Sequence, residues 1–552
     1  MEEMSIERVV LEEPQHPVTR QNSTTTATTA TTPTTTTPTT TPTTLTTPTP
    51  TTTPTPPYRR SDKYRQKILR QQQKAALAQR AAINFQANSK AKVAIIGGGI
   101  AGCALALALK RKGFTNIQIF EKDESFTTRR QGYGLTIQQA VKTLIQLGIS
   151  SIKEYDSPSS ARYIFSEKGD IISFFGRTFY KFVHSKKFNV HLSRQDLRYL
   201  LFQEIETEVV WNKCLRGIVH QENCVTLEFE DDVSEDFDLV VGADGIFSKV
   251  RHATFGNGAS IRDGLNYLGV IVVLGIVQCD HELLQEVIFE TSNGTVRIFC
   301  MPYIHRGTTM TTKTTKTTKT TKTTKTTKTT KTTNAPATTS AAPALKVQTM
   351  WQLSFPLDYA VANELRNDKE RLKAACMAQV SSFHAPVPDM IALTKLADMI
   401  ATPVFDFNPI ELDCLKKYPR VVLIGDASHA MSPFKSQGAN RAIIDASILA
   451  EKLSTLPIAE AVVSYERDTA KVNKRKVMVS RDKVAKLHCP DDANDFRTRT
   501  DVPNYHLTAT LKENNVGSWT HNLDQVIKSL VVVPAQPKKN KGGEGKKKGM
   551  DR

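Results

Sequence analysis

A short apolar run that stops at three consecutive glycines constrains the fold of this 552-residue chain most strongly. Residues 93–96 read Val-Ala-Ile-Ile, residues 97–102 read Gly-Gly-Gly-Ile-Ala-Gly, and the following residues up to 112 are mostly small or apolar. A second apolar run at 117–120 ends at Glu121. Short apolar runs on either side of a compact helical segment predict a strand, a helix and a second strand of an α/β fold.

The glycine run has the spacing of a turn that binds a dinucleotide. Gly97, Gly99 and Gly102 occupy the glycine positions of G-x-G-x-x-G, where the missing side chains let backbone N–H groups approach a pyrophosphate at a helix N-terminus. Glu121 ends the second strand, where a carboxylate accepts hydrogen bonds from ribose hydroxyls. An acidic residue there disfavours a 2′-phosphate, which indicates FAD or NAD rather than NADP. A plain glycine turn with a solvent-facing Glu121 is the alternative.

Two later segments also run an apolar strand into a polar turn. Residues 238–245 read Asp-Leu-Val-Val-Gly-Ala-Asp-Gly, and residues 421–429 read Val-Val-Leu-Ile-Gly-Asp-Ala-Ser-His. Together with the glycine loop, and in this order, they resemble the class A FAD-dependent monooxygenases of the p-hydroxybenzoate hydroxylase fold, which include aromatic hydroxylases and tetracycline-inactivating oxygenases. The resemblance covers residues 92 to about 490. It implies an α/β fold in which a Rossmann-like FAD-binding domain is interleaved with a mixed-sheet substrate domain.

The resemblance also implies roles for the residues at the strand ends. The glycine loop and Glu121 would hold the ADP half of FAD, and Asp426 would bind the ribityl chain. Asp244 and Gly245 would face both FAD and the passing nicotinamide nucleotide. FAD is therefore the expected cofactor, and NADH or NADPH the expected electron donor.

Two arginine positions are candidates for the FAD phosphates. Arg194 lies in a segment, 192–197, that resembles the helix start from which the family's arginine reaches these phosphates. Arg130, or its neighbour Arg129, follows the second strand and is expected to make a similar contact, with a solvated loop arginine as the alternative for the one not used.

The third motif leads into a helix whose first residues are Gly438, Ala439 and Asn440. The partial positive charge at a helix N-terminus would stabilise the negative charge that gathers near N1 and the C2 oxygen of a reduced flavin. Pro433 would fix the loop beside the isoalloxazine. Ser436 stands where the family commonly has glycine, so a positive φ at this position would strain the backbone and weaken flavin binding.

Two other kinds of site are disfavoured. His429 lies beside Ser428 and Asp426, but neighbouring residues on one turn cannot converge as a Ser-His-Asp triad, and the chain has no G-x-S-x-G elbow. The eight cysteines form no C-x-x-C pair, so no metal site is expected. No catalytic side chain is assigned, because the oxygen chemistry belongs to the flavin.

Composition changes sharply outside the central part of the chain. The formal net charge of +18 is concentrated in residues 58–92, in the Thr-Thr-Lys repeat at 311–333 and in the tail, which leaves the remainder close to neutral. Specific nucleic-acid binding is therefore not expected, although the basic tails are able to bind acidic surfaces weakly. Without an apparent signal peptide or an apolar run long enough to span a membrane, a cytoplasmic location is the default.

These observations predict a domain plan. Residues 287–301 and 347–355 are expected to pair as a hairpin, with the low-complexity segment in its loop. The predicted intervals are 1–57 (disordered, Thr/Pro-rich), 58–91 (basic helical lead-in), 92–490 (the FAD-binding monooxygenase fold, with FAD-binding parts at about 92–260 and 405–490 and a substrate sheet at about 261–404), 308–343 (low-complexity insertion), 491–535 (C-terminal extension) and 536–552 (basic tail).

The function that follows is an FAD-dependent monooxygenase. It would use NAD(P)H and O2 to oxygenate a planar or polycyclic organic substrate through a flavin hydroperoxide. Two alternatives stay open: another FAD oxidoreductase on the same fold, such as a halogenase, an epoxidase or a reductase, and a non-catalytic interaction protein that holds FAD or none.

Overall fold

The computed structural model divides the chain into two compact units, residues 1–68 and 69–552. It describes residues 60–128, 133–157, 159, 161–175, 189–205, 209–256, 260–285, 287–304, 306 and 347–489. Helix α1 (Arg60–Asn88) begins in the first unit and continues into the second. At its end, the Asn88 side-chain amide donates to the carbonyl oxygens of Leu453 and Leu456, each at 2.7 Å.

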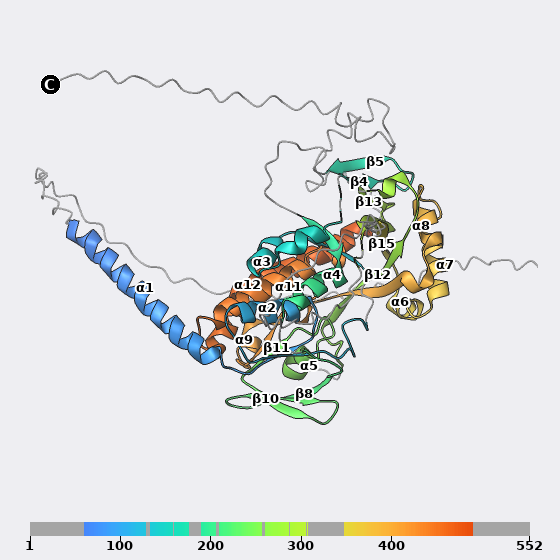
Figure 1. Ribbon diagram of the computed structural model, residues 1–552. Coiled ribbons are helices and arrows are strands. Elements are labelled where there is room, and N and C mark those ends of the chain that lie inside the picture. Colours follow the sequence, from blue (N-terminus) through green and yellow to red (C-terminus); the bar gives the residue numbers. More distant parts are fainter. Residues whose placement is uncertain are drawn as a thin grey trace, which may run out of the picture. The chain divides into compact units, whose positions relative to one another are not determined.

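A five-stranded parallel sheet forms the centre of one half of this unit, shown in Figure 1. Its order is β17 (Val421–Leu423), β11 (Leu239–Gly242), β1 (Val93–Ile96), β2 (Ile117–Phe120) and β7 (Val209–Val210). Helices α2 (Ile100–Arg111) and α11 (Gly438–Leu453) pack on one face through a continuous apolar core. The strand–helix–strand unit predicted around the glycine loop is therefore confirmed, and all three motif-bearing strands lie in one sheet.

Smaller sheets complete this half. A second apolar core joins the other face of the parallel sheet to an antiparallel sheet of β8 (Leu215–His220), β9 (Val225–Phe229) and β10 (Ser234–Phe237). Strands β3 (Gly134–Ile137) and β6 (Val190–Ser193) pair antiparallel.

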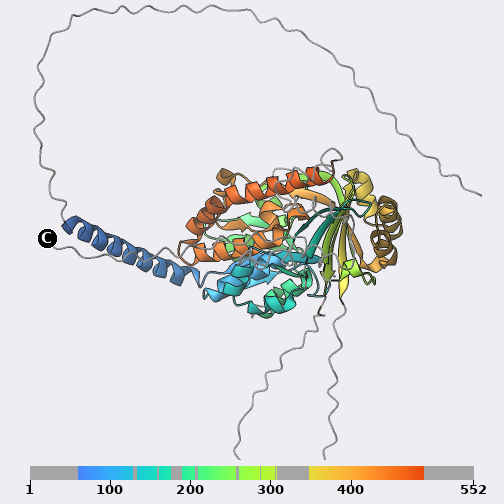
Figure 2. The same ribbon diagram turned by 90° about the horizontal axis from the view of Figure 1, so that it is seen from above.

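A seven-stranded mixed sheet forms the other half. Its order is β16 (Met399–Phe407), β12 (Leu265–Val277), β15 (Gln348–Pro356), β14 (Arg297–Tyr303), β13 (Val287–Ser292), β4 (Ala161–Phe165) and β5 (Ile171–Phe175). Helices α6 (Tyr359–Leu365), α7 (Lys369–Val380) and α8 (Val387–Leu393) cover one face, as the gold helices in Figure 2 show. The other face turns toward the parallel-sheet half.

Two sequence expectations for this sheet are wrong in detail. Residues 287–301 do not form one strand, because the chain turns at Asn293 and Gly294 and returns as β14. The pairing of β14 with β15 confirms the second half of the expected hairpin, and the insertion at 308–343 lies outside the described residues. The sheet also exceeds the expected interval of 261–404, because β4 and β5 join it through the parallel pairing of β4 with β13.

Helix α12 (Ile458–Leu487) runs along both halves, from the core around α11 to the seven-stranded sheet. None of the described helices is long and apolar enough to cross a membrane. The remaining helical segments are α3 (Val141–Gln146), η1 (Ser150–Tyr155), α4 (Arg194–Gln203), α5 (Lys249–Phe255), η2 (Glu282–Leu284), η3 (Leu396–Asp398), α9 (Leu412–Leu415), α10 (Asp426–His429) and η4 (Pro433–Lys435).

Candidate functional site

Two glycines of the loop after β1 are required by close backbone packing. Gly97 has φ of +107°, and a Cβ atom there would lie 2.6 Å from the carbonyl oxygen of Ala243 at the end of β11. A Cβ on Gly102 would lie 2.0 Å from the carbonyl oxygen of Gly97. Real Cβ atoms do not approach backbone so closely, so both positions accept only glycine without a backbone shift.

Gly99 differs from these two glycines because a Cβ there would meet nothing within 4 Å. It is the N-cap of α2, and no side chain caps the first N–H groups of this helix. Open space in front of uncapped N–H groups is the arrangement that binds a phosphate. The loop therefore fits the pyrophosphate of a dinucleotide.

Glu121 is buried and bonded to the loop, so the alternative of a solvent-facing residue is wrong. Its Oε2 accepts a hydrogen bond from the backbone N–H of Gly98 at 2.8 Å, and its Oε1 accepts from that of Asp123 at 3.1 Å. Each oxygen keeps further acceptor capacity. The observed geometry leaves the expected ribose contact possible and adds a structural role that the sequence did not show.

Arg198 is a loop-supporting residue that the sequence analysis missed. It is 2% exposed, its Nε donates to the carbonyl oxygen of Gly98 at 2.8 Å, and its Nη1 donates to that of Phe126 at 3.2 Å. Only its place four residues after Arg194 on α4 could have pointed to it, because residues at this spacing share a helix face.

Arg194 and Arg198 have different surroundings. Arg194 is partly exposed, and no hydrogen bond or ion pair of its guanidinium is found among the described residues, whereas Arg198 is bonded to the loop. The guanidinium carbon of Arg194 lies 5.7 Å from the ring centroid of Tyr133, but its charge has no ion-pair partner among the described residues, which suits an anionic ligand. Arg130 and Arg129 lie outside the described residues.

Asp426 lies beside the N-terminus of α11. It begins α10 directly after Gly425, which has φ of +58°, and its Oδ1 lies 3.5 Å from the position of a Cβ on Gly438. The surrounding protein raises the pKa of the Asp426 carboxyl, against the opposing charges of His429 and Arg194, although the residue itself is exposed. The carboxylate of Asp426 is therefore surrounded by protein groups yet open to a ligand.

Asp244 and Gly245 have different surroundings. The Asp244 carboxylate accepts hydrogen bonds from the Ser248 hydroxyl at 2.5 Å and from the backbone N–H groups of Lys249 and Val250 at 2.7 and 3.2 Å. It therefore organises the first turn of α5. Gly245 has φ of +81° with nothing within 4 Å of its would-be Cβ, so its backbone is open to a ligand.

The start of α11 is held in place by Asn440. Its Oδ1 accepts from the N–H of Gln138 at 2.8 Å and that of Ala140 at 3.2 Å, and its Nδ2 donates to the carbonyl oxygens of Thr136 and Ser436. The Asn440 side chain therefore joins α11 to the loop after β3. The backbone at Gly438 and Ala439 remains partly exposed at the helix N-terminus.

Ser436, in the loop before α11, has the positive φ that strains a residue other than glycine. Ser436 adopts φ of +50°, in the left-handed region, so a residue other than glycine occupies a glycine-type position. Pro433 is exposed and begins η4.

His429 belongs to a buried hydrogen-bonded cluster. Its Nε2 lies 2.5 Å from Oδ2 of Asp445, and Arg441 lies 2.7 Å from the other oxygen of Asp445. Both His429 and Asp445 are fully buried. His429 thus connects α10 to α11 and does not pair with Ser428, in agreement with the rejection of a hydrolase triad.

The sequence profile of a family described as FAD binding domain matches residues 90–372 and 412–479. The chain belongs to this family. A probable FAD-dependent monooxygenase of Arthroderma benhamiae is 33% identical over 196 residues, 33% of this chain and 44% of that relative. The 6-hydroxynicotinate 3-monooxygenase of Pseudomonas fluorescens is 24% identical over 371 residues, 66% of this chain and 82% of that relative.

Solved structures of the family share the fold. The structure of Klebsiella pneumoniae HpxO with FAD and uric acid covers 80% of this chain and 95% of its own, with a TM-score of 0.56 and 19% identity. The expected class A monooxygenase fold, the FAD cofactor and the oxidoreductase class are thereby confirmed for this FAD-binding protein. The open space at Gly99, the guanidinium of Arg194, which has no ion-pair partner among the described residues, and the exposed Asp426 fit the cofactor.

Proposed function

We propose that this FAD-dependent monooxygenase uses NADH or NADPH and O2 to insert one oxygen atom into a planar or polycyclic organic substrate. The observation that carries the proposal is the convergence of three distant motifs. The glycine loop, the turn at Gly245 and the α10–α11 segment follow neighbouring strands β1, β11 and β17 of one parallel sheet. Ligands of such sheets bind at the carboxyl ends of the strands, where these motifs lie.

Different residues would bind the two ends of FAD. The N-terminus of α2 with Gly97, Gly99 and Gly102 would hold the pyrophosphate, together with Arg194, and Glu121 would hold the adenosine ribose. These assignments rest on the open N–H groups, on the Arg194 guanidinium without an ion-pair partner among the described residues, and on the buried carboxylate.

The flavin end would be bound by the second and third motifs. Asp426 would accept hydrogen bonds from the ribityl chain, and the backbone at Gly245 would border the cofactor. When bound, FAD supplies the electron transfer and the oxygen activation. The N-terminus of α11, at Gly438 and Ala439, would stabilise the negative charge of a reduced flavin through its partial positive charge. Pro433 would limit water access beside the ring.

The substrate is expected on the face of the seven-stranded sheet that turns toward these residues. An apolar cluster of Ile288, Met301, Tyr303 and Met350 lies on this face. A Cβ on Gly134 of β3 would lie 2.9 Å from the Met301 sulfur, so the two halves are in contact here. Apolar, sulfur-containing and aromatic side chains suit a planar organic ligand.

Purified protein tests this function directly. It should be yellow, should consume NAD(P)H faster when a ligand is added, and should incorporate one atom of ¹⁸O₂ into the product. Product analysis separates a hydroxylase from a halogenase, an epoxidase or a reductase. Colourless protein that resists reconstitution with FAD would contradict the proposal and favour an interaction protein.

We further propose a cytoplasmic location. We also propose that the basic segments at 58–92 and 536–552 bind acidic surfaces weakly, because the positive charge is concentrated there. Imaging of the tagged full-length chain tests the location. Salt-sensitive sedimentation with anionic lipid vesicles, lost after neutralisation of the tail lysines, tests the binding.

A further inference from the structure

Three basic side chains form a cluster beside the loop that leads into α11. Lys435 ends η4 in this loop, and Arg475 and Lys476 are neighbours in the interior of α12, which packs against α11. The Lys476 ammonium donates a hydrogen bond to Oε1 of Gln437 at 2.6 Å, and Nε2 of Gln437 donates to the carbonyl oxygen of Lys435 at 3.2 Å. The Gln437 side chain therefore joins the loop that carries Lys435 to the helix that carries Arg475 and Lys476.

The positive charges of this basic cluster lie close enough to repel one another. Burial lowers the pKa of Lys476, and three nearby cations lower it further, namely Arg441, Arg475 and Lys435. Arg441 is itself paired with Asp445 at 2.7 Å, so its charge is offset. The charges of the three cluster residues remain in excess.

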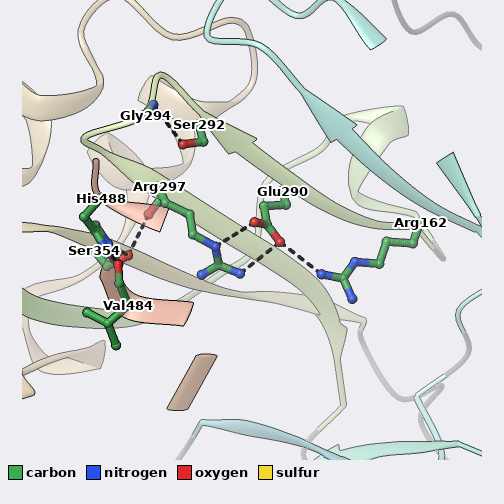
Figure 3. A network of polar contacts seen from close by, with 8 residues as sticks. All are labelled: Arg162, Glu290, Ser292, Gly294, Arg297, Ser354, Val484 and His488. Carbon is green, nitrogen blue, oxygen red and sulfur yellow. Dashed lines mark hydrogen bonds and ion pairs between the residues drawn. The ribbon is translucent and has the colours of Figure 1, made fainter. Parts of the chain in front are cut away.

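No carboxylate partner of the basic cluster is present in the part of the chain that the structure describes. Neither an ion pair of Lys435, Arg475 or Lys476 nor a side-chain hydrogen bond of Lys435 or Arg475 is found there. Three other cations of the same helix do have carboxylate partners, in the pairs Arg467–Asp468, Lys474–Glu411 and Arg481–Asp406. The two arginines of the seven-stranded sheet in Figure 3 also share a carboxylate, that of Glu290. The uncompensated charge of the basic cluster therefore suits an anionic ligand.

The basic cluster is reachable from solvent. Arg475 is exposed, and Lys435 and Lys476 are half-buried. Lys476 uses one of its three N–H donors on Gln437 and keeps the other two for a ligand. Cations of this kind suit a phosphate monoester, which carries nearly two negative charges at neutral pH and has three acceptor oxygens.

The basic cluster also lies next to the expected position of the flavin. Lys435 and Gln437 stand between Pro433, which would border the isoalloxazine, and Gly438 at the N-terminus of α11. The nicotinamide of the electron donor has to reach this ring to reduce it. The adenosine end of the same molecule then has to lie on a surface near the ring, and the basic cluster is such a surface.

We propose that Lys435, Arg475 and Lys476 bind the 2′-phosphate of NADPH, so that this enzyme uses NADPH in preference to NADH. This inference rests on the proposed function, which leaves the choice of donor open. The 2′-phosphate is a monoester, and it is the group by which the two donors differ. Binding of the pyrophosphate, which both donors carry, would give no preference. Gln437 positions Lys476 for this contact.

The test measures how each donor reduces the bound flavin. The FAD-loaded full chain is mixed without oxygen with increasing NADPH or NADH, and the loss of flavin absorbance gives a dissociation constant and a limiting rate for each donor. We expect NADPH to bind about tenfold more tightly than NADH, the effect of about one charge-assisted hydrogen bond, with similar limiting rates. Adenosine 2′,5′-bisphosphate should compete with NADPH more strongly than adenosine 5′-monophosphate.

The variants remove the charges in steps. Lys435→Gln/Arg475→Gln leaves the hydrogen bond between Lys476 and Gln437 in place, and its preference for NADPH should fall to about one, with unchanged affinities for NADH and FAD. Arg475→Gln changes one exposed helix position, so it should fold even if the double variant does not, and it should lower the preference about threefold. Lys474→Gln is the matched control, because Lys474 is an exposed, ion-paired lysine next to Arg475, and it should keep the native preference.

The outcomes separate this inference from the proposed function. Yellow protein that binds NADH at least as tightly as NADPH, or a preference that survives in Lys435→Gln/Arg475→Gln, would overturn the 2′-phosphate site alone. A fall in FAD affinity in this double variant would assign the cations to the cofactor and overturn the site as well. Failure of the native chain to bind FAD, or of both donors to reduce it, would instead contradict the proposed function.

Discussion

Replacing Gly99 by alanine tests whether the open space at the glycine loop is a phosphate site. Gly99 has φ of −80°, which alanine adopts without strain, and its Cβ would meet nothing within 4 Å. Alanine reduces the entropy of the unfolded chain, worth about 0.4–1 kcal/mol, but is a poorer N-cap than glycine by a similar amount. The free energy of unfolding of the apoprotein should therefore change by less than about 0.5 kcal/mol.

Binding of FAD should respond very differently to the same methyl group. A methyl group in front of the first turn of α2 keeps a phosphate from the helix N–H groups. The loss of one charged hydrogen bond, about 1.5–3 kcal/mol, lowers FAD affinity by about 10- to 100-fold. Quenching of flavin fluorescence during titration of the apoprotein measures this affinity, and denaturant unfolding of the apoprotein measures stability.

Gly102→Ala is the matched control in the same loop. Its Cβ would lie 2.0 Å from the Gly97 carbonyl oxygen, so this variant should lose about 1–3 kcal/mol of stability even without FAD. If Gly99→Ala bound FAD as tightly as the native chain, or if it destabilised the apoprotein as much as Gly102→Ala, the assignment of the open space to a phosphate would be refuted.

Three other perturbations have expected outcomes. Asp426→Ala should weaken FAD by about 1–3 kcal/mol through lost ribityl hydrogen bonds, and unchanged FAD occupancy would remove Asp426 from the site. Burial and the nearby Asp445 raise the pKa of Glu466 from 4.5 to about 8, so the folded state binds this proton more tightly and stability should fall as pH rises from 4.5 to about 8. Denaturant unfolding across this range should show a smaller fall in Glu466→Gln; an equal fall would contradict the shift. Ser436→Gly should stabilise the protein by about 0.5–1 kcal/mol, because it relieves a left-handed backbone at φ of +50°, and a lower melting temperature would argue against strain there.

The local sequence pattern was sufficient to predict the elements that would bind the cofactor. Where a parallel strand turns directly into a helix, the tight backbone around Gly97 and Gly102 excludes every side chain, so the residue type itself reveals the geometry. The same reasoning anticipated the positive φ at Ser436, and it correctly placed Asp426 after a buried strand. These features depend on residues that are close in sequence.

The remaining features depend on which distant segments become neighbours. The roles of Arg198 under the glycine loop and of Asp445 beside His429 follow from helix packing, which no spacing in the chain specifies. Glu290 and Arg297 form a buried ion pair only because residues 287–303 fold into a hairpin instead of a single strand. Sequence determined where a dinucleotide can bind, because that requirement is local. Tertiary structure decided which distant charges are paired and buried, because burial and pairing are properties of the assembled fold.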